Sequence, residues 1–273
     1  MRIPLRQLLA VAAIALSGCS SPPSAPEAAT PKPATSAVQS EPDASARQPA
    51  KQALQKPLKV GFVYVGPVGD AGWTFQHDLG RQAVEKAYGA RVQTTYVEKV
   101  SEYDDGRVFR DLAAQGNQLI FATTFGFMKQ VQQVAPTLPG VKFEHAQGYK
   151  RAENVRTYDV RTYEGAYLAG MLAGGMTRNN QLGIVASIPI PEIVAVINAF
   201  TLGAQAVNPR VVTRVEWVML WFHPPKEAAA AQKLFKKGVD VMFQTTDSSA
   251  ALEAAERLGR RGIAWDSDMR AFA

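Results

Sequence analysis

From residue 58 onward, short β-type runs alternate with longer helical runs, and this alternation restricts the possible fold more than any other feature of the chain. The first β-type run contains Lys59-Val60-Gly61-Phe62-Val63, and residues 73–88 follow with helical spacing. Such alternation is typical of βαβ units, whose strands pair in parallel. We therefore predict an α/β fold built from parallel sheets.

The number of β-type runs predicts two lobes. About ten strands are expected, which is more than the five or six of a usual sheet. The long apolar helix predicted at 163–176, followed by a fresh strand at 182–187, marks the start of a second lobe. We therefore predict an N-terminal α/β lobe over residues 58–159 and a second α/β lobe over residues 160–273.

Two local predictions can be compared directly with a structure. Helix 103–115 has Asp104 as a possible N-cap, because a short side-chain acceptor there can bind the free N–H groups of the first turn. Helix 73–88 has four apolar residues at helical spacing that we expect on its buried face. These are Phe75, Leu79, Ala83 and Tyr88.

Residues 1–19 read as an export signal. Arg2 and Arg6 precede an apolar run from Leu8 to Leu16, which is too short for a membrane span of about 20 residues. The run ends in Leu16-Ser17-Gly18-Cys19, which is similar to the lipobox of bacterial lipoproteins, so Cys19 is the expected lipidation site. The alternative is an ordinary signal peptide with a chance cysteine.

Residues 20–57 read as a tether. They hold eight of the 17 prolines of the chain and no aromatic residue. Such a segment buries too little apolar surface to offset the entropy lost on ordering, and prolines favour an extended chain. We expect a disordered tether between the lipidated Cys19 and the folded lobes.

Charge and motif content exclude several functions. Residues 58–273 carry 24 Lys and Arg against 21 Asp and Glu, which does not favour nucleic acid as a partner. The only cysteine excludes an internal disulfide, and the three histidines lack metal-ligand spacing. No dinucleotide, Walker or Gly-x-Ser-x-Gly motif occurs. We therefore predict no enzyme activity, no cofactor and no metal.

Aromatic and acidic residues gather where the predicted strands end, which is where open α/β sheets bind ligands. Aromatic faces stack on flat rings, and carboxylates accept hydrogen bonds from N–H or O–H groups. For the aromatic residues the alternative is core packing, and for the acidic residues it is helix N-capping. The residues concerned are Asp70, Trp73, Phe125, Trp221, Asp247 and Asp266.

Several motifs, in order, resemble the basic membrane protein family of ABC-importer substrate-binding lipoproteins. The resemblance runs from about residue 58 to the C-terminus and implies the two-lobed type I periplasmic-binding fold. It also implies a purine base or nucleoside-like ligand. The motifs are Gly69-Asp70-Ala71-Gly72-Trp73, Thr124-Phe125-Gly126-Phe127-Met128, Tyr163-Glu164-Gly165-Ala166-Tyr167, Asn198-Ala199-Phe200-Thr201 and Trp265-Asp266-Ser267-Asp268.

The resemblance implies roles for individual residues. Asp70 falls at the base-contacting acid of the family, Trp73 and Phe125 in loops that flank the base, and Asp266 at a carboxylate that meets ribose. Asn198, Trp221 and Asp247 are expected on the side of the second lobe. The sequence differs at Gly69-Asp70, where the nucleoside binders have Asn-Asp. Family members also continue beyond the point that corresponds to Ala273, so we expect the last part of the fold to be missing here.

These observations predict a substrate-binding protein anchored by lipid on the extracytoplasmic face of the cell membrane. Its expected partners are a purine-like solute and the permease and ATPase of an ABC importer. The alternative is a ligand-sensing lipoprotein that signals to a membrane receptor instead of feeding an importer.

Overall fold

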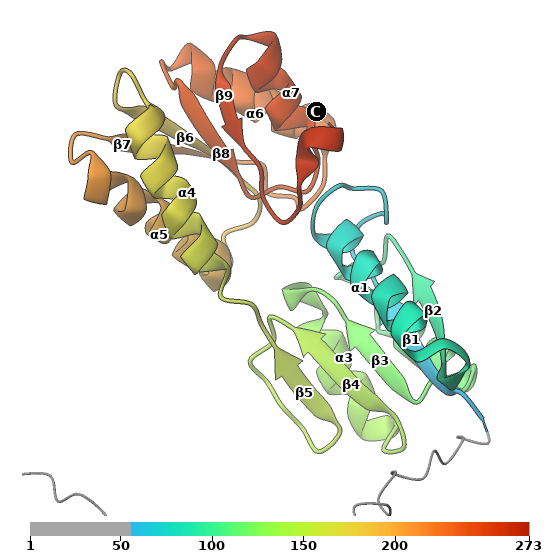
Figure 1. The fold of residues 1–273 in the computed structure, drawn as a ribbon. Coiled ribbons are helices and arrows are strands. Elements are labelled where there is room, and N and C mark those ends of the chain that lie inside the picture. The colour runs from blue at the N-terminus through green and yellow to red at the C-terminus, as the bar shows by residue number, and fades with distance from the viewer. Residues whose placement is uncertain (1–55, 273) are drawn as a thin grey trace, which may run out of the picture. The chain divides into compact units, whose positions relative to one another are not determined.

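The computed structural model describes residues 56–272, which form two parallel α/β halves in succession (Figure 1). Residues 1–55, and with them the expected signal, Cys19 and nearly all of the tether, lie outside the described residues. We call residues 58–158 lobe 1 and residues 162–272 lobe 2, because each range is built around one sheet.

Lobe 1 is a five-stranded sheet with strand order β2-β1-β3-β4-β5, and all of these strands pair in parallel. Its strands are β1 (Leu58–Val63), β2 (Val92–Val97), β3 (Leu119–Ala122), β4 (Lys142–Ala146) and β5 (Val155–Tyr158). Its α-helices are α1 (Trp73–Tyr88), α2 (Arg107–Ala114) and α3 (Met128–Val134).

Lobe 2 is a four-stranded parallel sheet with strand order β7-β6-β8-β9. Its strands are β6 (Gln181–Ala186), β7 (Val212–Trp217), β8 (Val241–Gln244) and β9 (Arg261–Ile263). Its α-helices are α4 (Thr162–Met176), α5 (Pro191–Val207), α6 (Pro224–Lys236) and α7 (Ala250–Arg257). The described chain passes from the first sheet to the second between β5 and α4.

The strands alternate their side chains between two apolar layers, as parallel strands covered on both faces do. In lobe 2, Ile184 and Phe243 pack with α4 and α5, whereas Val185 and Met242 pack with α6 and α7. In lobe 1, Ile120 belongs to a large core with α2 and α3. The other face of that sheet has a smaller cluster around Val60, Phe62 and Tyr64. The α1 face of lobe 1 is therefore less completely packed.

Two local predictions were wrong. Helix α2 begins at Arg107 rather than near 103, because Gly106 takes a left-handed φ of 80° and starts the helix there. Asp104 consequently lies before the helix and does not cap it. In α1, the fully buried residues are Thr74 and Asp78, whereas Leu79, Ala83 and Tyr88 are exposed and Phe75 is half-buried.

The buried face of α1 is polar because it carries a hydrogen-bond network. Asp78 accepts from Tyr64 Oη, directly after β1, at 3.3 Å and from Arg81 Nε at 2.6 Å. The helix is thus held on its sheet partly by hydrogen bonds of a charged pair, Asp78 with Tyr64 and Arg81 with Thr94, which an apolar pattern does not reveal. Within residues 56–272, no helix combines the length and apolarity that a bilayer crossing needs.

Candidate binding site between the two lobes

A small cavity lies between the two lobes at the carboxyl ends of their strands. Its volume is about 20 Å³, room for about one water molecule. Its walls combine three indoles, three carboxylates, and a few amide, hydroxyl and aliphatic side chains. The lining residues are Val65, Trp73, Thr124, Gln147, Glu192, Ile193, Trp221, Thr245, Asp247, Trp265 and Asp266. We call this the inner cavity.

Asp70 lies beside the inner cavity but does not line it. Its side chain is 1% exposed and is occupied by the N-terminus of α1. Oδ1 accepts from the N–H groups of Gly72 and Phe75, both at 2.9 Å, and Oδ2 accepts from Thr74 N–H at 3.2 Å. Asp70 therefore satisfies the free N–H groups at the start of α1, as the N-cap alternative predicted.

Asp247 reaches the same helix end from the other lobe. It follows β8, is 3% exposed, and its Oδ1 accepts from Trp73 N–H at 3.2 Å. Gly72 makes this approach possible, since a Cβ there would lie 2.7 Å from the Asp247 Cα. The N-terminus of α1, which carries partial positive charge, thus faces carboxylates from both lobes.

Trp221 makes a second direct contact between the lobes. Its Nε1–H donates to Glu102 Oε1 at 3.0 Å, and the Thr124 hydroxyl donates to the same oxygen at 2.6 Å. In lobe 2, Asp247 N–H donates to Trp221 O at 3.0 Å, so the two loops that carry these residues are tied together. Trp221 and Asp247 are therefore positioned as one unit.

A buried glutamate on α6 braces that unit from behind. Glu227 is fully buried and accepts from His223 N–H at 2.7 Å and from Ser248 Oγ–H at 2.6 Å. His223 and Ser248 belong to the loops that carry Trp221 and Asp247. Their backbone is thus fixed before any solute arrives.

Burial and mutual repulsion raise the pKa values of the carboxyls in the cavity. The pKa of Asp247 lies well above its ordinary value because of burial and the charges of Asp70 and Asp266. Burial and the charge of Glu192 do the same to the pKa of Asp266. Burial, with repulsion from Asp159, raises the pKa of Glu192 to about 7. The cavity is thus a desolvated site whose carboxyls hold a proton more readily than ordinary ones, and a carboxyl that holds a proton can donate as well as accept. No group of three or more His, Cys, Asp or Glu residues in the described chain is arranged to hold a metal ion.

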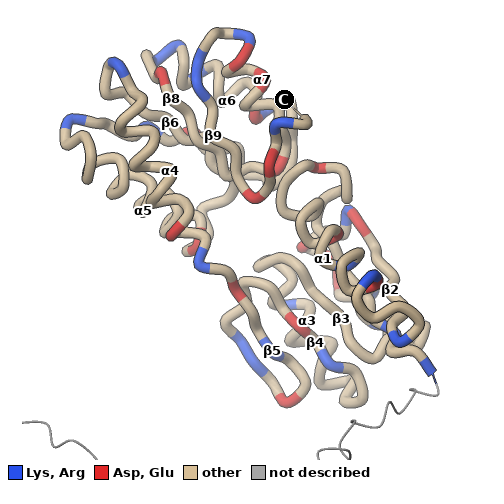
Figure 2. The backbone as a smooth tube through the Cα atoms, in the orientation of Figure 1, with Lys and Arg blue, Asp and Glu red and all other residues tan. Residues whose placement is uncertain are grey.

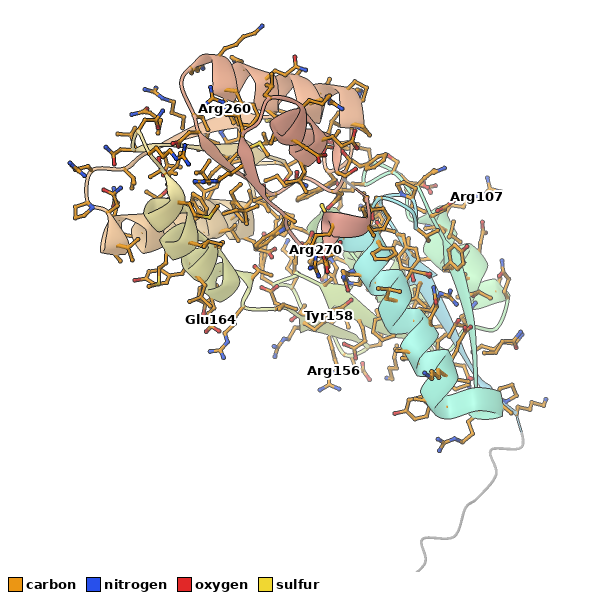
Figure 3. The ribbon with its side chains drawn as sticks, turned by 45° about the horizontal axis from the view of Figure 1, so that its top comes forward. Arg107, Arg156, Tyr158, Glu164, Arg260 and Arg270 are labelled. Atoms are coloured by element: carbon orange, nitrogen blue, oxygen red, sulfur yellow. The ribbon has the colours of Figure 1, made fainter. Side chains whose placement is uncertain are left out.

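A larger cavity of about 680 Å³ adjoins the inner one. It extends over the α1 face of lobe 1, where Phe62 and Phe121 stack with centroids 4.7 Å apart, and Tyr158 on β5 borders it (Figure 3). Both cavities are lined by Trp73, Gln147, Trp265 and Asp266. We call this the outer cavity. It is lined by Arg81, Arg161 and His77, whereas no basic residue among residues 56–272 lines the inner cavity.

Comparison with known proteins identifies the family. Residues 58–273 match the family model Bmp, described as ABC transporter substrate-binding protein PnrA-like. The chain belongs to the Bmp family. Over 220 residues it is 47% identical to a purine-binding protein of Brucella abortus, covering 80% of this chain and 63% of that protein. It is 42% identical to a putative ABC transporter glucose-binding protein of Haloferax volcanii, covering 79% of this chain and 55% of that protein.

The Bmp chain described here therefore spans less than two thirds of the length of these curated relatives. Solved structures support the fold. A solute-binding protein of Aeropyrum pernix superposes with a TM-score of 0.67 at 23% identity, covering 76% of this chain and 61% of that one. One from Conexibacter woesei gives 0.61 at 21% identity, covering 77% and 70%. The predicted type I periplasmic-binding architecture with parallel sheets is confirmed.

Four of the seven predicted ligand-binding residues line the inner cavity of this Bmp chain, namely Trp73, Trp221, Asp247 and Asp266. Phe125 instead contacts Tyr149, with centroids 6.2 Å apart, and lines a separate surface hollow. Asn198 is exposed on α5 and lines none of these cavities. With Asp70 engaged at α1, these three residues do not face the inner cavity.

Sequence reasoning missed several residues that the fold brings to the cavity. Glu192 and Ile193 occupy the first turn of α5, directly after the loop that follows β6, and so replace Asn198 as the α5 contribution. Gln147 directly follows β4, and Trp265 follows β9. Their position just after a strand was the available signal, because every parallel strand directs its following loop to this edge.

Proposed function

We propose that this chain captures a purine base or a nucleoside-like solute between its lobes for an ABC importer, on the extracytoplasmic side of the membrane. The observation that carries the proposal is the inner cavity, in which the indoles of Trp73, Trp221 and Trp265 surround carboxylates from two loops of lobe 2. Indoles stack on flat rings, and carboxylates orient them through N–H or O–H groups. The purine-binding relative in Brucella abortus supports the same ligand class.

Capture requires the lobes to separate and close again. The inner cavity has a volume of about 20 Å³, far below the roughly 300 Å³ or more of typical ligand pockets. The single chain crossing between β5 and α4 in the described residues is suited to hinge motion. In the closed form the solute would be enclosed, and the head would then dock on permease and ATPase subunits.

A thermal-shift screen tests the proposed ligand class. The solutes are purine bases, purine nucleosides and, because of the Haloferax volcanii relative, glucose. A ligand present at 100 times its Kd stabilises the native state by about 2.7 kcal/mol, which corresponds to a rise in Tm of about 5–10 °C for a chain of this size. Stabilisation by glucose without any response to purines or nucleosides would refute purine capture.

The proposed anchor is tested separately through Cys19. We expect Cys19→Ser to remove labelling by a fatty-acid probe and to release the protein from membranes, or to leave its precursor unprocessed. Several acyl chains would otherwise anchor it stably, at about 0.8 kcal/mol per buried CH₂. Unchanged labelling of the variant would contradict the anchor and leave the binding proposal standing.

A further inference from the structure

The inner cavity contains many unused hydrogen-bond acceptors. Within the described chain, no protein donor reaches either oxygen of Asp266. None reaches Oδ2 of Asp247, whose Oδ1 accepts from Trp73 N–H. Glu192 Oε2 is buried without a partner, while a hydroxyl donates to its other oxygen at 3.3 Å. Four carboxylate oxygens therefore lie at the cavity wall with free acceptor capacity.

Most of the donors at the same wall are already engaged. Trp221 Nε1–H and the Thr124 hydroxyl both donate to Glu102, and Trp73 Nε1–H donates to Thr123 O. Thr245 Oγ1 accepts from Ser187 N–H at 3.2 Å and lies 3.5 Å from Ser187 Oγ, to which its hydroxyl can donate. Among the described residues that line the cavity, the Trp265 indole is the remaining side-chain donor, since the Gln147 side chain interacts with the Glu192 carboxyl. In their ionised form, the three carboxyls of the cavity thus offer a solute mainly acceptors, and N–H donors on a solute would favour that ionised form.

The local charge has the same sign. In the part of the chain that the structure describes, three carboxyl side chains and no Lys, Arg or His line the inner cavity, and Arg81 and Arg161 line only the outer one. Figure 2 shows the acidic stretch in the loop after β9. Figure 3 shows basic side chains such as Arg156 and Arg107 projecting away from the ribbon. An anion or a ring edged with carbonyls would place acceptors against acceptors in a desolvated space.

The backbone at Asp266 is also unusual. Its φ of 61° lies in the left-handed region, which costs energy for any residue with a side chain. Asp and Asn tolerate this conformation better than other residues do. The strained turn aims a carboxylate without a protein donor at the boundary of both cavities.

We infer that the inner cavity selects amino-substituted, donor-rich heterocycles over acceptor-rich or anionic ones of the same shape. This inference rests on the proposed function, since it specifies which flat heterocycles that site takes. The amino and ring N–H groups of the solute would meet the free oxygens of Asp247, Asp266 and Glu192. Phosphorylated solutes would be rejected because no cation lines the cavity to receive them.

A matched pair of purines tests this inference. 2,6-Diaminopurine and xanthine have the same ring system. 2,6-Diaminopurine has amino groups at positions 2 and 6, where xanthine has carbonyls, whereas xanthine has N–H groups at ring positions 1 and 3, where 2,6-diaminopurine has acceptor nitrogens. 2,6-Diaminopurine therefore presents more donor hydrogens, and presents them at positions 2 and 6. Isothermal titration with the lipid-free mature chain is expected to show at least about tenfold tighter binding of 2,6-diaminopurine, because an unpaired buried polar group costs about 1–3 kcal/mol. Asp266→Asn, which tolerates the same backbone, and Glu192→Gln should each narrow that ratio. Glu256→Gln replaces an exposed carboxylate on α7 that does not line the cavity, and it should leave the ratio of the two affinities unchanged.

The outcomes separate the inference from the function beneath it. Xanthine binding as tightly as or more tightly than 2,6-diaminopurine would overturn the donor preference and leave purine capture intact. An unchanged ratio in both Asp266→Asn and Glu192→Gln would overturn the assignment to these carboxylates. If no purine or nucleoside binds, the proposed function is refuted, and the donor preference is refuted with it.

Discussion

At the scale of single residues, Asp70 and Asp247 show how one residue type serves two purposes at one helix end. Both carboxylate oxygens of Asp70 accept hydrogen bonds from N–H groups at the start of α1, so Asp70 stabilises the folded state. Oδ1 of Asp247 accepts a hydrogen bond from Trp73 N–H, and Oδ2 lies at the cavity wall without a donor in the described chain. The two residues should therefore respond differently to substitution.

We expect Asp70→Ala to lower the Tm by roughly 2–4 °C for a chain of this size, because loss of the side chain that caps a helix N-terminus costs about 1 kcal/mol.

We expect Asp247→Asn to leave the Tm of the ligand-free protein unchanged or higher, because it removes a charge repelled by Asp70 and Asp266. Ligand affinity of Asp247→Asn should fall by about tenfold or more. Calorimetry and titration measure both, and a large Tm loss in Asp247→Asn would argue for a structural role.

Glu192 predicts a pH dependence of stability. Its pKa is raised from 4.5 to about 7 in the folded chain, so folding favours the protonated form. Stability from this group is present below pH 4.5, is lost as the pH rises toward about 7, and stays lost above it. Glu192→Gln should therefore have the higher Tm at pH 8, and the difference from the native chain should shrink toward pH 5. A difference that is constant between pH 5 and pH 8 would refute this assignment.

At the scale of elements, the contact between α4 and α5 depends on two glycines. A Cβ on Gly170 would overlap the carbonyl of Phe200, and a Cβ on Gly203 would overlap the carbonyl of Tyr167. The two helix backbones therefore touch directly. This contact holds the apolar layer of lobe 2 that contains Phe200 and Phe243, stacked 4.8 Å apart.

We expect Gly170→Ala to destabilise the protein by about 1–3 kcal/mol, because overpacking forces the helices apart. Gly175→Ala is the matched control in the same helix, since a Cβ there meets nothing within 4 Å. The control should be neutral or slightly stabilising, because Ala favours helix over Gly. Chemical denaturation compares the two, and equal stability of both variants would contradict the close helix contact.

Most elements were predictable because their pattern is local. The predicted bounds of α1 are those of the structure, since the helix ends at Tyr88, directly before the turn at Gly89. Which face of α1 is buried was not predictable, because that face carries the Asp78–Arg81 pair where the pattern predicted apolar residues.

The cavity was predictable only as a set of loops. Within a loop, the choice between Phe125 and Thr124 depends on backbone direction, which sequence spacing does not specify.

At the scale of the whole molecule, closure of the lobes is limited by space at one position. A side chain on Gly72 would collide with the Asp247 backbone, so Gly72→Ala is expected to hold the lobes apart. We expect about tenfold weaker ligand binding and a solution scattering radius that ligand no longer reduces. Gly69→Ala, in the same loop with nothing within 4 Å, should behave like the native chain. Normal ligand-induced compaction of Gly72→Ala would contradict this role.

The distribution of acids over the two lobes has an energetic consequence for closure. Asp70 belongs to lobe 1, and Asp247, Asp266 and Glu192 belong to lobe 2, so closing the lobes without a ligand brings carboxyls together away from water, where keeping them ionised costs more free energy. A ligand rich in N–H groups would pair with these carboxyls and remove that cost. Under the proposed importer role, the permease would then meet mostly ligand-loaded protein, and little ATP would be spent on empty protein.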